Sequence, residues 1–212
     1  KLDYEVLAKI REDFRDGPNV VWRVYFGVDG RYNLLTDADT LRAVYNVTND
    51  TCGPMKYCEG VKYMDIGHNE YLTDLSFVSG MPNLEVMIAS GCAAKELVGF
   101  ENCKKLTWLE LAYCYKLKNI DCLSSCESLT YLNLSFTGVS NYQPLDGLPL
   151  KRFVCLSPKA IPKVLPDFGK HLVVQLAVVQ DEPLAAVQHR QSLTDLAFPF
   201  VADGLVFVDD FL

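Results

Sequence analysis

The feature that most constrains the fold of this chain is an internal repeat with a period of 20 to 23 residues. Each copy fits the frame apolar-x-x-apolar-x-apolar-x-x-[Asn/Cys/Thr], most clearly in "LEVMIASGC" (84–92), "LTWLELAYC" (106–114) and "LTYLNLSFT" (129–137). Weaker copies extend the pattern in both directions. The nine copies start at Val21, Leu41, Val61, Leu84, Leu106, Leu129, Leu150, Leu172 and Leu193. Such regular spacing indicates a solenoid, in which each repeat forms one turn of a superhelix.

Each repeat divides into a strand segment and a return segment. The apolar-x-x-apolar-x-apolar stretch predicts a short strand that pairs in parallel with the neighbouring repeats, about 4.8 Å away. The return segment carries apolar residues three apart, such as Leu117, Ile120 and Leu123, which favours one turn of 3-10 helix. We call the last frame position, occupied by residues such as Asn69 and Cys92, the ladder position. Its side chain is expected to point inward and hydrogen-bond loop backbone.

These motifs resemble those of bacterial leucine-rich repeat proteins of the internalin type with 22-residue repeats, over residues 41–158. "YLTDLSFV" (71–78) and "VSNYQPL" (139–145) resemble the convex segment of that type, and "ESLTYLNLS" resembles its strand segment. The resemblance implies an α/β fold, a right-handed leucine-rich repeat solenoid with a parallel sheet on its concave face. It also implies protein binding by that face in a secreted or cell-surface protein. Cys92 and Cys114 depart from the type, which usually has Asn there.

Three parts are predicted along the chain: an N-terminal helical cap over 1–20, the repeat solenoid over 21–180, and a C-terminal cap or degenerate repeat over 181–212. The last part contains a predicted helix (181–193) and a predicted strand (204–212). In the first part, apolar residues recur at helical spacing, which predicts an amphipathic helix that covers the open end of the solenoid. These residues are Leu2, Val6, Leu7, Ile10 and Phe14.

Composition narrows the class of protein. The 212 residues are 50% hydrophobic and 22% charged, which is typical of a globular chain and excludes a disordered one. The net charge of −7 argues against nucleic acid as the main partner. No apolar run reaches the roughly 18 residues of a membrane-spanning helix, so no span is predicted.

The eight cysteines first suggest a disulfide framework, because their number is even. Most of them, however, recur in register with the repeat, where a cysteine acts as a small buried apolar residue. The sequence therefore favours free, buried thiols, with the redox state of Cys52 and Cys122 left open. The cysteines in register are Cys58, Cys103 and Cys126, three residues before a frame, Cys92 and Cys114 at ladder positions, and Cys155 within a strand.

The variable positions of the frame indicate where a partner binds. Side chains alternate along a strand, so these positions from successive repeats form one concave surface. They carry a broken aromatic stripe with acidic neighbours, and Trp, Tyr and Arg are enriched in interface hot spots. The sequence predicts a binding surface for a protein ligand. Its residues are Tyr63, Asp65, Glu85, Trp108, Glu110, Tyr131, Asn133 and Arg152.

Other functions fit less well. Aromatic rings beside acidic groups also suit a glycan, but a flat repeat surface offers no pocket, so carbohydrate binding ranks below protein binding. A purely structural spacer is a third alternative. The three histidines, His68, His171 and His189, are widely separated, and no GxSxG, P-loop, HExxH or GxGxxG motif occurs. No enzyme activity, catalytic residue, metal site or cofactor is therefore predicted.

Overall fold

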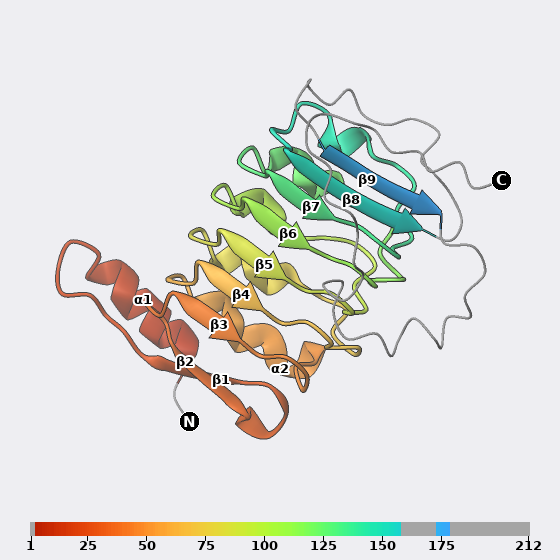
Figure 1. Cartoon of the computed structure of the whole chain (residues 1–212). Coiled ribbons are helices and arrows are strands. Elements are labelled where there is room, and N and C mark those ends of the chain that lie inside the picture. The colour runs from red at the N-terminus through yellow and green to blue at the C-terminus, as the bar shows by residue number, and fades with distance from the viewer. Residues whose placement is uncertain (1–2, 158–172, 179–212) are drawn as a thin grey trace.

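The computed structural model describes residues 3–157 and 173–178, and the predictions for 181–193 and 204–212 lie outside these ranges. Its central feature is a seven-stranded parallel sheet whose strands follow one another in chain order (Figure 1). This arrangement confirms the predicted α/β solenoid. The strands are β3 (Thr40–Arg42), β4 (Tyr63–Asp65), β5 (Val86–Ile88), β6 (Trp108–Glu110), β7 (Tyr131–Asn133), β8 (Arg152–Ser157) and β9 (Val173–Val178).

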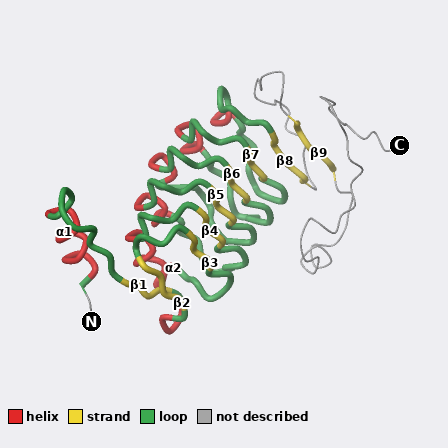
Figure 2. Tube along the Cα trace, turned by 60° about the vertical axis from the view of Figure 1, so that its left-hand side comes forward, coloured by secondary structure: helices red, strands yellow, loops and turns green. Residues whose placement is uncertain are grey.

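Short helical turns return the chain on the side opposite the sheet (Figure 2). Most of them are 3-10 turns, as the spacing of apolar residues predicts, because the steps between repeats leave no room for longer helices. A four-residue α-helix precedes the first of them. These turns are α2 (Asn49–Cys52), η2 (Gly53–Tyr57), η3 (Ser76–Gly80), η4 (Phe100–Asn102), η5 (Asp121–Ser125) and η6 (Gln143–Leu145).

The core lies between the sheet and the convex turns. The central residues of five successive strands are aligned in register and each is at most 1% exposed; they are Leu41, Met64, Met87, Leu109 and Leu132. Apolar residues of the turns, such as Phe100 and Leu123, face them and are fully buried. Stacking one repeat on the next therefore buries a continuous core, which no single repeat builds alone.

The register corrects the outer copies of the frame. Leu41 pairs with Met64 rather than Val61, so the frame of that repeat begins three residues earlier, at Ala38, and its ladder position is Asn46. At the other end Arg152 pairs with Val173, so β9 is one residue out of the predicted register. The frames that start between 61 and 150 are confirmed.

The frame that starts at Val21 is wrong as a solenoid repeat. Its strand, β1 (Arg23–Phe26), pairs antiparallel with β2 (Tyr32–Leu35) in a separate two-stranded sheet. The reason is the intervening turn η1 (Val28–Gly30), in which Asp29 and Gly30 both have positive φ. An Asp-Gly pair in this conformation reverses the chain into a hairpin.

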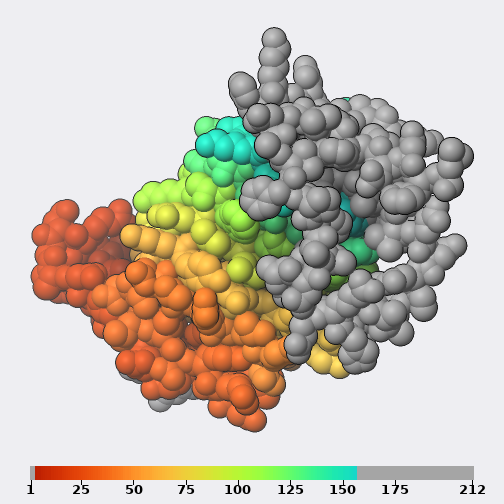
Figure 3. Space-filling view, in the orientation of Figure 1, coloured from red at the N-terminus to blue at the C-terminus, as the bar shows by residue number. Residues whose placement is uncertain are grey.

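The predicted N-terminal helix is present as α1 (Tyr4–Asp13), and the side chain of Asp3 caps it. The predicted apolar face is wrong for Val6, Ile10 and Phe14, which are exposed, whereas Leu2 lies outside the described residues. The helix turns Leu7, which was predicted, together with Tyr4 and Ala8 toward the core. In the space-filling view, α1 and the hairpin form a lobe (red and orange) at one end of the solenoid (Figure 3).

All eight cysteines lie in the described part of the chain; all are free, and seven are buried. At the ladder positions, the Cys92 thiol donates to the Ile66 carbonyl (3.4 Å) and the Cys114 thiol to the Ala89 carbonyl (3.3 Å). Burial raises the pKa of the Cys92 and Cys58 thiols to about 12. These thiols therefore stay protonated and fill the core, as the repeat register predicts.

Thiol titration tests this arrangement. In the native chain at pH 8, an aromatic disulfide reagent is expected to modify none of the eight thiols quickly, because thiolate and access are both required and burial raises the pKa even of the partly exposed Cys122 thiol to about 12. In denaturant without reductant, all eight should react. Fewer than eight reactive thiols in denaturant would show disulfides and contradict the structure.

Candidate functional site

The centre of the concave sheet carries a column of paired side chains. Tyr63, Val86, Trp108, Tyr131 and Arg152 occupy equivalent positions on β4 to β8 and are aligned by the parallel register. The strands bring them together because each repeat adds 21 to 23 residues and returns the chain to the same position on the sheet. The sequence prediction of a shared column is therefore confirmed in geometry, with Val86 as the break in its aromatic stripe.

Trp108 and Tyr131 form the most extensive aromatic surface in this column. Their ring centroids are 3.5 Å apart and the ring planes differ by 7°, so the rings are stacked face to face. Trp108 remains 41% exposed. The stack keeps both rings in one orientation, which leaves little side-chain freedom to lose when a partner binds.

Glu110, on the neighbouring strand, fixes the orientation of Tyr131 through a hydrogen bond. Its carboxylate accepts hydrogen bonds from the Tyr131 hydroxyl (3.1 Å) and the Asn133 amide (2.7 Å). Burial raises the pKa of Glu110, and the hydrogen bonds from Tyr131 and Asn133 partly offset this effect. The pKa of Tyr131 is raised by burial and by the nearby charge of Glu110. Glu110 thus acts as a positioning group within the site.

Asn133 does not reach the surface, contrary to its predicted place in the binding site. It is 1% exposed, and its amide donates to the Glu110 carboxylate on the neighbouring strand. Its Oδ1 accepts the amide hydrogen of Ser135 (2.9 Å). A variable position of the frame is thus used here for internal support.

The remaining predicted site residues flank the Trp108–Tyr131 stack. Glu85 and Arg152 are exposed, and Tyr63 and Asp65 are partly exposed. The Arg42 guanidinium lies 5.4 Å from the centroid of the Tyr63 ring. The sequence frame that starts at Leu41 is three residues out of register with the structure, so it did not predict this contact. Tyr63 and the stack therefore lie apart on one sheet, with Val86 between them.

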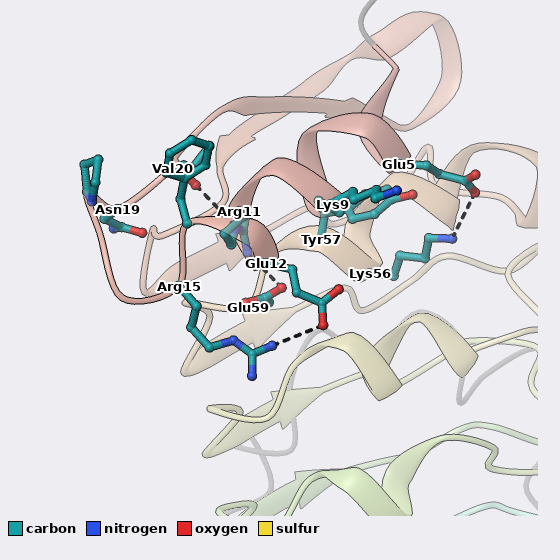
Figure 4. A pocket seen from close by; sticks show the side chains of 13 residues that line it. Glu5, Lys9, Arg11, Glu12, Arg15, Asn19, Val20, Lys56, Tyr57 and Glu59 are labelled. Atoms are coloured by element: carbon teal, nitrogen blue, oxygen red, sulfur yellow. Dashed lines mark hydrogen bonds and ion pairs between the residues drawn. The ribbon is translucent and has the colours of Figure 1, made fainter.

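A hollow of about 730 Å³ lies at the N-terminal end of the molecule, against α1 and η2 (Figure 4). Its walls mix polar and apolar side chains, and most of their charges pair with one another. Arg11 contacts Glu59 (2.8 Å), Arg15 contacts Glu12 (3.5 Å) and Lys56 contacts Glu5 (4.0 Å). The Arg11–Glu59 and Lys56–Glu5 pairs join the N-terminal lobe to the solenoid, so we assign the hollow a structural role.

Among the described residues, no group of three or more His, Cys, Asp and Glu side chains is placed to hold a metal ion. Within the same residues, no helix has both the length and the apolar character needed to cross a membrane.

The parallel strands, the stacked repeats and the convex 3-10 turns define a leucine-rich repeat solenoid. No family pattern and no curated protein matches the sequence. Among solved structures, the chain is similar to internalin F of Listeria monocytogenes, with 22% identity and a TM-score of 0.50. It is also similar to internalin C2 of the same organism, with 15% identity and a TM-score of 0.53.

The extent of these matches differs. The match to internalin F covers 57% of this chain and 36% of that chain, and the match to internalin C2 covers 80% and 72%. The chain thus spans about a third of internalin F. At these identities the likeness concerns the fold, which is an internalin-like leucine-rich repeat fold.

Proposed function

We propose that this chain is a non-enzymatic module that binds a protein partner through its concave sheet. The observation that carries the proposal is the exposed Trp108–Tyr131 stack at the centre of the sheet. Large aromatic side chains held at a surface are typical of interface hot spots. Their exposure is costly in water, and binding a partner removes it.

The polar groups around the stack favour a protein over a glycan. Sugar binding needs acceptors beside the rings that are available to hydroxyl groups. The Glu110 oxygens already accept from Tyr131 and Asn133, and Asn133 is buried. The exposed charges of Glu85 and Arg152 lie toward the margins, where a protein interface has its polar rim. By resemblance of fold to the internalins, we propose a bacterial surface or secreted setting.

The test compares the wild-type chain with a Trp108→Ala/Tyr131→Ala variant. A partner recovered by pull-down is purified, and its affinity for each chain is measured by biolayer interferometry. We expect the double variant to bind at least about 100-fold more weakly, because two hot-spot side chains are removed. Tyr71→Ala is the matched control, since Tyr71 is 79% exposed and lies outside the strands.

Two outcomes would contradict the proposal. Unchanged affinity of the folded double variant would show that the partner binds elsewhere. Specific binding on a glycan array, lost in the double variant, would instead support carbohydrate recognition by the same rings.

A further inference from the structure

A second column of side chains borders the sheet. In five successive repeats, the residue before the ladder position has left-handed backbone, with φ between 57° and 74°. Bulky residues adopt left-handed backbone only at a cost in conformational energy. Its recurrence at one position of successive repeats is therefore a property of the repeat. Four of these residues carry rings, and one has no side chain. The column consists of Tyr45, His68, Gly91, Tyr113 and Phe136.

The rings of this column form two stacked pairs. The centroids of Tyr45 and His68 are 5.4 Å apart, and those of Tyr113 and Phe136 are 4.9 Å apart with their planes within 8°. Gly91 lies on the repeat between the pairs. We call this position, flanked by His68 and Tyr113, the Gly91 gap. Two repeats span about 10 Å, so one planar group at Gly91 would continue the stack at the same spacing.

The space at Gly91 is sufficient for a side chain. A Cβ built on Gly91 would have His68 as its nearest neighbour, with Cα and Nδ1 both at 3.6 Å, an ordinary contact distance. The next repeat has a tyrosine, Tyr113, at the equivalent position and with the same backbone conformation. Packing therefore does not require residue 91 to be without a side chain.

Hydrogen-bond acceptors lie on the His68 side of the gap, around Gly67. The Asp65 Oδ1 and the Ser90 carbonyl oxygen are 3.5 and 3.4 Å from the Cβ position of Gly67, and the Ser90 carbonyl already accepts the His68 amide hydrogen (2.8 Å). Asp65 accepts a hydrogen bond from the Gly67 amide (3.2 Å) and forms no ion pair within the described residues. The surroundings therefore favour a planar group that is cationic and rich in donors.

An arginine side chain has this chemistry. Its guanidinium is planar, permanently charged and offers five donors, and it stacks on aromatic rings. The chain itself contains this contact twice, with the Arg11 guanidinium 4.0 Å from the Trp22 centroid and that of Arg42 over Tyr63. A lysine ammonium lacks the planar shape and fits a stack less well.

We propose that the Gly91 gap accepts an arginine side chain of the protein partner, stacked in line with His68 and Tyr113 and hydrogen-bonded to Asp65. This inference rests on the proposed function, since it names one partner group for the concave side of the solenoid. It adds a site that the Trp108–Tyr131 stack does not include.

The test is an NMR titration of the whole ¹⁵N-labelled chain with acetyl-Gly-Arg-Gly-amide, followed at the Gly91 amide. We expect saturable shifts and an affinity about tenfold higher than for acetyl-Gly-Lys-Gly-amide. Gly91→Tyr should abolish the shifts by filling the gap. Gly91→Asn is the control, because asparagine accepts left-handed backbone and its side chain is short. Asp65→Asn should weaken binding about fivefold while leaving the backbone unchanged.

Three results would overturn the inference: equal binding of the two peptides, tighter binding of the tryptophan analogue acetyl-Gly-Trp-Gly-amide, or unchanged binding by Gly91→Tyr or Asp65→Asn. If Gly91→Tyr does not fold, Asp65→Asn decides alone. The two proposals can fail separately. If partner binding survives the loss of Trp108 and Tyr131, the Trp108–Tyr131 stack is rejected as the binding site. The peptide titration reports on the Gly91 gap independently of the partner.

Discussion

Gly80→Ala is expected to lower the free energy of unfolding by about 3 kcal/mol, the upper part of the range for overpacking. A Cβ at Gly80 would overlap the carbonyl oxygen of Lys56 and lie 2.8 Å from its carbonyl carbon. Both atoms belong to backbone, so no flexible side chain can move aside. The convex turns η2 and η3 would have to separate, which loosens the core beneath them. Urea unfolding followed by circular dichroism measures the loss.

Gly53→Ala is the matched control in the adjacent turn. Nothing lies within 4 Å of its Cβ position, and its φ of −49° and ψ of −41° are helical. Alanine restricts the unfolded chain without strain there, so this variant is expected to be more stable by about 0.5–1 kcal/mol. A Gly80→Ala chain as stable as the wild type would contradict the close approach of η2 to η3. Equal losses in both variants would contradict the packing explanation.

The central repeats could be predicted because one-dimensional spacing determines their structure. Once Leu84, Leu106 and Leu129 recur at 22 and 23 residues, a parallel stack with a convex return follows from the strand and turn geometry. The failure at Val21 has a different origin. Apolar residues at 21, 24 and 26 satisfy the frame, but the Asp29–Gly30 turn decides the pairing. Turn conformation, which the frame ignores, outweighs the apolar pattern there.

Prediction of the candidate site from the sequence is limited in a similar way, because the frame does not specify contacts between side chains of neighbouring repeats. Alternation along a strand correctly places Tyr63, Trp108 and Tyr131 in one column. It does not reveal that Asn133 is buried with its amide bound to the Glu110 carboxylate, because that contact joins neighbouring repeats. The stacking of the rings on either side of Gly91 was also not predicted, since it depends on backbone conformations that the residue types alone do not specify.

Asn69→Ala is expected to cost about 2 kcal/mol of stability, at roughly 1 kcal/mol for each of the two buried groups left without a partner. Asn69 occupies a ladder position and is 2% exposed. Its Oδ1 accepts from the Val47 amide (2.8 Å), and its Nδ2 donates to the carbonyls of Ala43 (2.9 Å) and Ile66 (2.7 Å). Alanine removes all three bonds. The Ile66 carbonyl keeps the bond from the Cys92 thiol, but the Val47 amide and the Ala43 carbonyl lose their partner in the core. Urea unfolding with an unchanged m-value would attribute the loss to the folded state.

Asn69→Cys separates hydrogen bonding from space filling, because the chain already uses cysteine at the next two ladder positions. Cys92 and Cys114 each donate one bond to a carbonyl of the preceding repeat. A cysteine at 69 would be able to keep the bond to the Ala43 carbonyl and would leave only the Val47 amide without a partner, so we expect a cost of about 1 kcal/mol. The stability order should be wild type, then Asn69→Cys, then Asn69→Ala. If the cysteine and alanine variants were equally unstable, the ladder thiols would be apolar filling only, and the bonds from Cys92 and Cys114 would contribute nothing to the stacking of repeats.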